Sequence, residues 1–262
     1  MSHKHPRTVL IALGMLVLPA MLRAQAAPAE PPVIDPVAMD ALRKMGEYLR
    51  SLKVFQITGE ITTEQVLADS QKIQLTKQVE MVASRPNNLR AQIKSDKFER
   101  HLVYDGSTFT LYAPKKKVYA TVPAPPTINE LATMIEEKHG IELPLVDMFR
   151  FGTAEETIKE ITAAKDVGPS VCARVTCRHY AFRQPGLDWE IWIQEGDYPL
   201  PRKVVLTTRT DEARPQHTAT YTWNLAPSFD KDSFAFVAPE GTQKITLADL
   251  TANKTAAKGG QD

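Results

Sequence analysis

Cysteine is scarce in this sequence, and recognised catalytic motifs are missing from it. The chain of 262 residues contains two cysteines, Cys172 and Cys177, and no second ligand pair accompanies them to indicate a metal site. There is no glycine-rich phosphate loop, no dinucleotide-binding fingerprint, no G-x-S-x-G turn and no H-E-x-x-H helix. We therefore expect a protein that is not an enzyme and that has no metal or cofactor.

Long hydrophobic runs are also missing, except for one near the N-terminus. Lys4 and Arg7 precede an apolar run over residues 9–22, and residues 24–26 (Ala-Gln-Ala) offer the small-x-small pattern of a signal peptidase site. We predict a cleaved signal peptide, residues 1–26, and hence a periplasmic protein with no transmembrane segment in the mature chain. A retained anchor is the weaker alternative, because proline and arginine interrupt the run.

Net charge is low as well. The chain has 32 Lys or Arg and 31 Asp or Glu. The signal peptide contains three of the basic residues and none of the acidic ones, so the mature chain keeps 29 basic and 31 acidic residues. A protein that binds nucleic acid needs a strongly basic face, and we expect no nucleic-acid partner.

The two cysteines leave a question open. An exported protein can form a disulfide. Cys172 and Cys177 would be about 16 Å apart on an extended strand, so a bond between them requires the chain to turn at residues 173–175. A disulfide and two reduced thiols, one of them in the core, are both compatible with the sequence.

Composition at the two ends of the mature chain predicts irregular segments. Residues 27–34 are rich in Pro and Ala and predict a flexible leader. Residues 251–262 are polar and contain Lys and Gly, which predicts a disordered tail. We expect a single domain over residues 35–250.

The domain begins with an amphipathic helix. Asp35 can cap it and Pro36 suits its first position. Apolar residues then recur at helical spacing to about Leu52. These residues are Ala38, Leu42, Met45, Leu49 and Leu52.

Some seventy residues with a hydrophobic period of two follow, which predicts antiparallel strands with one buried face. Turns are predicted at residues 85–88, 105–106 and 114–117. The apolar face of the first two strands contains Phe55, Ile57, Gly59 and Ile61, then Ile73, Leu75, Val79 and Met81.

The strand pattern stops and later resumes. Thr127 and Glu130 have the spacing of a capping box, Gly140 can end that helix, and residues 143–151 predict a second short helix. Strong alternation returns from Val167 onward. We predict a helical insert that crosses the sheet.

This order of elements resembles the LolA/LolB-like superfamily of bacterial periplasmic lipoprotein carriers over residues 36–247. The resemblance rests on residues 85–90 (RPNNLR), 103–107 (VYDGS) and 111–114 (LYAP). Within that superfamily the chain resembles more closely an exported family of unknown function, in residues 177–183 (CRHYAFR), 188–193 (DWEIWI) and 199–203 (PLPRK). The resemblance implies an α+β fold, a long antiparallel curved sheet that forms an incomplete β-barrel wrapped over helices, with an apolar cavity for acyl chains and no catalytic residues.

We accordingly expect a periplasmic carrier that binds a lipid, a lipoprotein acyl chain or another hydrophobic ligand, because apolar surface left open inside a half-closed barrel can take such a ligand. The alternative is an envelope protein-interaction or sensor module whose interior is fully packed, with other envelope proteins as partners. The predicted cavity residues are Phe55, Ile57, Leu75, Val79, Met81, Leu89, Ile93, Ile191, Tyr221 and Trp223.

Several other residues allow two interpretations. Trp192 falls on a polar face, where either a loop shields it or it belongs to a contact surface. Residues 115–117 (Lys-Lys-Lys) suit an exposed hairpin tip, and they could also meet anionic head groups. His179 is on the strand face of Cys177, and we interpret it as structural. An enzyme would need a His or carboxylate that converges with others in a cleft.

Overall fold

The computed structural model describes residues 33–151, 158–172, 174–230 and 232–251. The predicted signal peptide, the predicted leader up to residue 32 and the tail from residue 252 lie outside these residues. The helical segments are α1 (Pro36–Ser51), the 3-10 turn η1 (Pro114–Lys116), α2 (Ile128–His139), α3 (Asp147–Arg150) and α5 (Leu247–Thr251).

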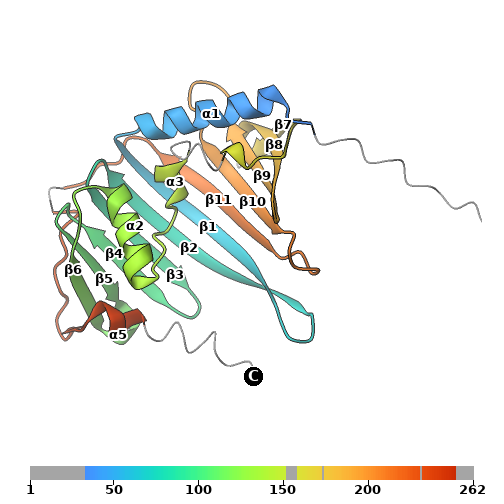
Figure 1. Ribbon diagram of the computed structural model, residues 1–262. Helices are drawn as coiled ribbons and strands as arrows, with labels where there is room; N and C mark the ends of the chain where they lie inside the picture. The colour runs from blue at the N-terminus through green and yellow to red at the C-terminus, as the bar shows by residue number, and fades with distance from the viewer. Residues whose placement is uncertain (1–32, 152–157, 173, 231, 252–262) are drawn as a thin grey trace, which may run out of the picture. The chain divides into compact units, whose positions relative to one another are not determined.

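One sheet of 12 strands contains every strand of the described residues (Figure 1). In chain order the strands are β1 (Val54–Val66), β2 (Lys72–Ser84), β3 (Asn88–Ser95), β4 (Glu99–Tyr104), β5 (Thr108–Ala113), β6 (Val118–Pro123), β7 (Ala163–Cys172), β8 (Val175–Gln184), β9 (Leu187–Gln194), β10 (Pro201–Thr208), β11 (Gln216–Asn224) and β12 (Gln243–Lys244).

The sheet is strongly curved and open. Its order is β12-β6-β5-β4-β3-β2-β1-β11-β10-β9-β8-β7, so β12 and β7 form its two edges and do not pair with each other. This confirms the predicted α+β fold with an incomplete barrel. One detail differs from a purely antiparallel sheet, because β12 pairs with β6 in parallel.

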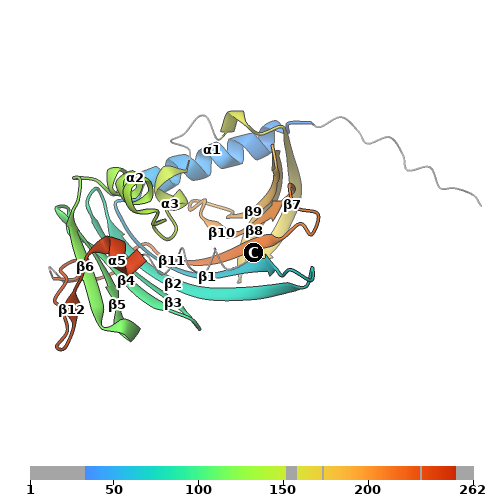
Figure 2. The same ribbon diagram turned by 60° about the horizontal axis from the view of Figure 1, so that its bottom comes forward.

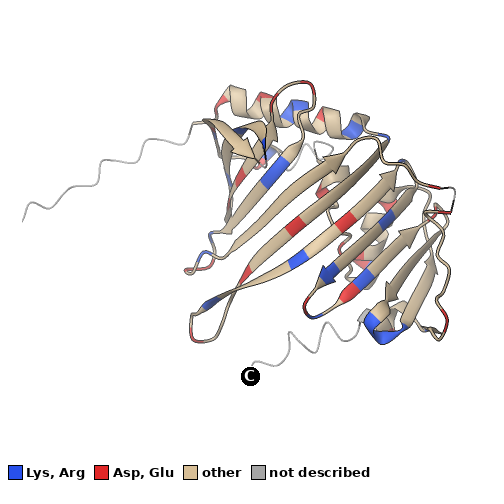
Figure 3. Cartoon of the chain, turned by 180° about the vertical axis from the view of Figure 1, so that it is seen from behind, with Lys and Arg blue, Asp and Glu red and all other residues tan. Residues whose placement is uncertain are grey.

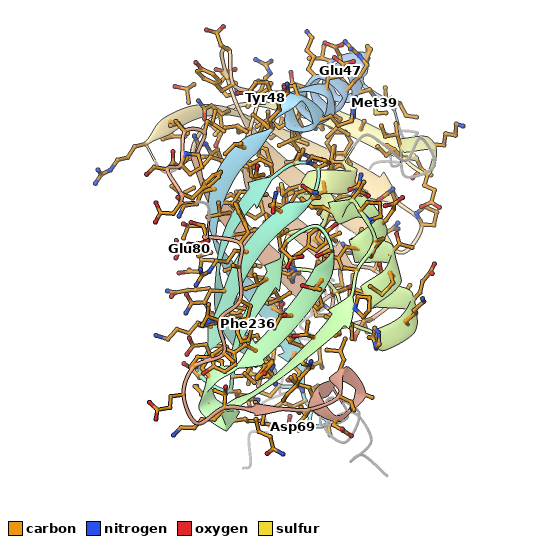
Figure 4. The ribbon with its side chains drawn as sticks, turned by 90° about the vertical axis from the view of Figure 1, so that its left-hand side faces the viewer. Met39, Glu47, Tyr48, Asp69, Glu80 and Phe236 are labelled. Carbon is orange, nitrogen blue, oxygen red and sulfur yellow. The ribbon has the colours of Figure 1, made fainter. Side chains whose placement is uncertain are left out.

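Helices cover one side of this sheet. Figure 2 shows α1, α2 and α3 inside the curve of the strands. We call this concave side the inward face and the opposite side the outer face. Figure 4 shows Glu80 of β2 projecting outward from the outer face into solvent, on the side of the sheet opposite α2. Successive residues of each strand therefore alternate between helices and solvent.

The N-terminal helix is capped as predicted. The Asp35 side chain accepts a hydrogen bond from the Val37 backbone N–H, and Pro36 is in the first turn. The apolar stripe of α1 is buried, with Leu42, Met45 and Leu49 each about 1% exposed. Just before the helix, Ile34 bridges to Ala164 at the start of β7.

The helical insert is confirmed, although its second helix is shorter than expected. Thr127 caps α2 by accepting from the Glu130 N–H, and Gly140 ends it in the left-handed conformation. Residues 143–151 were expected to be helical, but only Asp147–Arg150 are. Leu145 has a φ of 56°, and a left-handed residue cannot continue a right-handed helix.

The chain returns to β6 along the outer face. Arg90 of β3 donates to the Ser233 carbonyl at 3.3 Å. Phe236 packs on Tyr112 and Tyr119, with ring centroids 5.7 and 5.1 Å apart. The segment then pairs with β6 in the parallel direction as β12.

Candidate ligand-binding face

Part of the inward face is closed by helices. Phe55, Ile57, Met81 and Leu89 are at most 1% exposed. The ring of Phe55 lies 5.6 Å from that of Phe149 in α3. We call this part the covered half, and its interior is packed side chain against side chain.

Arg85, in the turn between β2 and β3, joins the covered half to α3. Its guanidinium lies 4.9 Å from the centroid of the Phe149 ring and donates from Nη2 to the Met148 carbonyl at 3.3 Å. Burial lowers its pKa, and its buried Nε has no hydrogen-bond partner. The sequence indicated only a turn here, since nothing in the local pattern shows that a turn arginine will lie under a helix.

The rest of the inward face is less protected, and we call it the uncovered half. Leu75 is on the inward face of β2, yet it is 38% exposed. Ile73 and Ile93 on the same face are half-buried. These strands continue beyond α2 and α3 toward the tip of the β1–β2 hairpin (Figure 1). These three apolar residues, which we call the apolar strip, therefore remain partly accessible to solvent, and Lys77 lies among them on the inward face of β2.

A group of polar residues lies on the inward side near this strip. The Nδ1 atom of His217 and the hydroxyl of Thr63 are hydrogen-bonded at 2.8 Å. Burial lowers the pKa of His217, and Lys77 lowers it further, whereas Asp147 and Glu142 oppose the shift. Burial raises the pKa of Tyr221, and Asp147 adds to that rise.

Asp147, at the start of α3, interacts electrostatically with His217 and Tyr221. Its side chain is exposed to solvent, yet desolvation by the surrounding protein raises its pKa, and Glu142 raises it further. A carboxylate on an open convex surface would keep its water shell. Asp147 is therefore an exposed carboxylate at the start of α3 whose pKa the neighbouring protein raises.

The strand register places all ten predicted cavity residues on the inward face. Seven of them are at most 8% exposed, and Leu75, Ile93 and Trp223 are more accessible. Their common face is thus established, and their role in lining a ligand cavity stays a prediction.

Two hollows lie on the outer face. One of about 270 Å³ lies between Thr110, Thr121 and the Phe236 segment. The other, of about 410 Å³, follows the polar residues of β11, β1, β2 and β3, among them Thr58, Glu80 and Lys94. Figure 3 shows this face free of helices and dotted with charges of both signs.

The cysteines are adjacent across the β7–β8 hairpin. Both are buried and carry free thiols, and the Cys172 side chain and backbone both hydrogen-bond the Cys177 thiol. Burial raises the pKa of Cys177 to about 12. The register of β7 and β8 places the two cysteines on either side of the hairpin, and the disulfide stays one of the two alternatives.

Trp192 is covered by neighbouring strands rather than by a loop. The His179 ring stacks on it with centroids 3.9 Å apart, and Lys203 Nζ lies 4.5 Å from its centroid. His179 also bonds Glu190 at 2.8 Å, and Asp188 accepts from Arg183 and Arg214. Glu190 is therefore held by a hydrogen bond to His179, and Asp188 belongs to ion pairs, along the outer face.

Within the described residues, no three His, Cys, Asp or Glu side chains gather in a way that could hold a metal ion. Of the helices that the structure describes, none is long and apolar enough to cross a membrane.

Comparison with known proteins adds the following. The model of the family "Predicted periplasmic protein (DUF2092)" matches residues 38–248. No curated protein matches the chain. Among solved structures, the lipoprotein LppX of Mycobacterium tuberculosis is 9% identical, with a TM-score of 0.46, over 75% of this chain and 100% of that one. LprF of Mycobacterium bovis is 12% identical, with a TM-score of 0.46, over 81% and 100%. A LolA superfamily protein of Nitrosomonas europaea is 11% identical, with a TM-score of 0.33, over 76% and 97%.

Proposed function

The chain belongs to the family of predicted periplasmic proteins DUF2092, and from this premise and the inward face we propose that it is a non-enzymatic periplasmic binding protein for a hydrophobic ligand. The membership confirms the resemblance to an exported family that the sequence indicated. The ligand class proposed is a lipid, a lipoprotein acyl chain or a similar amphiphile.

The partly exposed apolar strip of the uncovered half carries this proposal. Leu75 is 38% exposed, and Ile73 and Ile93 are half-buried, although all three point to the side of the sheet that holds the core. Apolar side chains in a concave place gain free energy when a ligand removes them from water.

The free energy of burying apolar surface is enough to hold an acyl chain without specific polar contacts. Each buried CH2 contributes about 0.8 kcal/mol, so a few methylenes on the strip outweigh the loss of side-chain freedom there. The covered half is already packed. We therefore place the ligand first in the uncovered half, on the strip of Ile73, Leu75 and Ile93.

Mass spectrometry of gently purified protein tests the proposal, with copurified lipid as the expected result. A binding titration with a fluorescent fatty acid then locates the site. Leu75→Gln should weaken binding about 10-fold, roughly 1.4 kcal/mol of lost apolar contact. Thr76→Gln is the matched control, because Thr76 is the next residue of β2 and points to the outer face.

Two results would end the proposal. One is protein free of lipid that also binds no fatty acid in the titration. The other is equal loss of binding in both variants, since a change on the outer face cannot disturb an inward ligand directly.

A protein-interaction or sensor module is the second candidate, and the edge strand β7 favours it. Apart from the bridge between Ile34 and Ala164, no strand of the described residues pairs with the edge of β7 that faces away from β8. Val167 and Val171 on β7 are 49% and 79% exposed, and Val37 of α1 is 52% exposed. Unpaired edges with exposed apolar residues suit strand addition by a partner.

Crosslinking in cell envelopes distinguishes the two candidates. The interaction module predicts a stable partner crosslinked at β7 and no bound lipid. The carrier predicts bound lipid whether or not a partner is captured.

A further inference from the structure

Positive charge is concentrated at one corner of the sheet. Residues 94–100, 114–118 and 243–249 contain seven Lys or Arg and three Asp or Glu, an excess of four positive charges in a chain that is otherwise nearly balanced. We call the exposed lysines in the two turns and on β12 the basic corner. It consists of Lys97, Lys115, Lys116, Lys117 and Lys244.

The fold brings these three segments together. Lys115 of η1 donates from Nζ to the carbonyl of Asp96, in the β3–β4 turn, at 3.2 Å. The backbone of β12 begins beside the η1 turn, because the Gln243 N–H donates to the Lys117 carbonyl at 3.0 Å. The corner lies at the end of the sheet away from α1, at the lower right of Figure 3.

Neighbouring acids leave most of this charge uncompensated. Glu99 accepts from His101 at 2.8 Å and Gln92 at 2.9 Å, and these hydrogen bonds lower its pKa. Asp249 is bonded to Thr246. Among the residues that the structure describes, no lysine of the basic corner forms an ion pair.

An exposed aromatic residue belongs to one of the turns that form this corner. Phe98 follows Lys97 in the β3–β4 turn and is 38% exposed. The Arg100 guanidinium lies 5.7 Å from the centroid of its ring. Arg100 is partly buried with its pKa lowered by desolvation, and its hydrogen bond goes to the carbonyl of Glu99.

We propose that the basic corner docks this protein on an anionic lipid surface, with the lysines near the phosphate groups and Phe98 at the level of the acyl boundary. Clustered lysines are attracted to anionic head groups over a Debye length, and an exposed aromatic ring gains free energy at the interface. A soluble polyanion would satisfy the lysines but would leave Phe98 in water. The joint presence of both features therefore favours a bilayer.

This docking is independent of ligand binding, although it would serve it. Arg100 points to the inward face of β4, opposite Ile93 of the apolar strip. A membrane bound at the basic corner would thus lie beside the uncovered half. A hydrophobic ligand could then pass between bilayer and strip over a short distance.

Vesicle cosedimentation of the full chain tests the proposal. We expect binding to vesicles of phosphatidylcholine mixed with phosphatidylglycerol, little binding to pure phosphatidylcholine, and a marked loss in high salt. The triple variant K115Q/K116Q/K117Q should bind the anionic vesicles about 100-fold more weakly, at about fivefold for each lysine. Its matched control is K44Q/K53Q/K165Q, which removes the same charge from exposed sites on α1, the following loop and β7.

Phe98 provides a second measurement that does not depend on the triple variant. In Phe98→Trp, the fluorescence of the introduced tryptophan, taken as the difference from the unmodified chain, should shift to shorter wavelength with anionic vesicles. It should stay unchanged with a soluble polyanion such as dextran sulfate. Phe98→Ser should weaken vesicle binding.

Three results would overturn the proposal: equal binding to neutral and anionic vesicles, equal loss in both triple variants, or no spectral shift in the vesicle-bound Phe98→Trp variant. None of them would bear on the copurification of lipid, so the carrier hypothesis is judged separately.

Discussion

The covered and uncovered halves of the inward face lie on the same long strands and have opposite environments. In β2, Met81 and Leu75 occupy equivalent inward positions. Met81 is 0% exposed, whereas Leu75 is 38% exposed. The comparison teaches that alternation decides which way a side chain points, and that a second layer decides whether it is buried.

The dimensions explain why the second layer ends early. β1 has 13 residues, which at about 3.3 Å per residue span about 43 Å. A helix with its side chains is only about 10 Å wide. α1 and the short α3 therefore cover one part of each long strand, and no helix of the described residues lies over the hairpin end of β1 and β2 (Figure 1).

The largest expected effect comes from the same substitution made in both halves. Leu89→Ala, in the covered half, should reduce the free energy of unfolding by about 3 kcal/mol, because it leaves a cavity in a packed interior. Leu75→Ala should cost less than about 1 kcal/mol, since water already reaches that side chain. Urea denaturation measures both. Equal losses would show that the uncovered half is packed as tightly as the covered one.

The cysteine pair provides a reference outside both halves. We expect the protein purified under oxidising conditions to be lighter by two hydrogens and more stable than its reduced form by about 2 kcal/mol, because the bond closes a short loop in the unfolded chain. A Cys172→Ser/Cys177→Ser variant should not respond to reductant. Intact mass and free thiols that stay unchanged in oxidant would favour two reduced thiols.

The cap of α2 tests how firmly the covering layer is held. Thr127→Ala removes the side chain that accepts from the Glu130 N–H and should cost about 1 kcal/mol. Thr127→Ser keeps the acceptor and is the control. Hydrogen exchange should increase in Ile128–His139 of the Ala variant and remain low in Leu89, and uniform exchange across both would mean that helix and sheet open together.

A pH titration gives the smallest effect and concerns the border between the halves. Burial lowers the pKa of His217 in the folded protein, so below about pH 6.5, the usual value for the unfolded chain, the unfolded state binds more protons. The free energy of unfolding should then fall as pH falls through the lowered pKa, and should be unaffected above about 6.5. In His217→Gln this slope should disappear. A slope that persists in the variant would have to come from other groups.

The raised pKa of Asp147 acts in the opposite direction and serves as a check. Its folded state holds a proton to higher pH than the unfolded chain does, so its contribution to stability is lost as pH rises. In Asp147→Asn, the loss of unfolding free energy that accompanies a rise in pH through the raised pKa of Asp147 should therefore disappear. The two variants together separate the histidine from the carboxylate.

Much of the fold was predictable because its signals are local. Asp35 with Pro36, and Thr127 with Glu130, place polar groups where the first N–H groups of a helix need acceptors. The second insert helix was predicted too long, since Leu145 adopts the left-handed conformation and no glycine marks that position in the sequence.

The candidate sites were less predictable. The ten inward residues were recognised from period two alone, and that period does not show which part of the sheet the helices cover. Lys115–Lys117 could be noted as a charged tip, yet their proximity to Lys97 and Phe98 depends on contacts between separate hairpins. Arg85 gave no signal, because its partners Phe149 and Met148 come from another element.

The order of residues along the chain was enough to establish the capped helices, the two faces of each strand and the family, since all of these depend on neighbours a few positions apart. Tertiary structure alone decided where the helical layer stops, which inward side chains remain accessible, and which lysines share a corner with an aromatic ring. The reason is physical: burial and electrostatic potential are sums over everything nearby in space, and residues far apart in sequence contribute most of those sums.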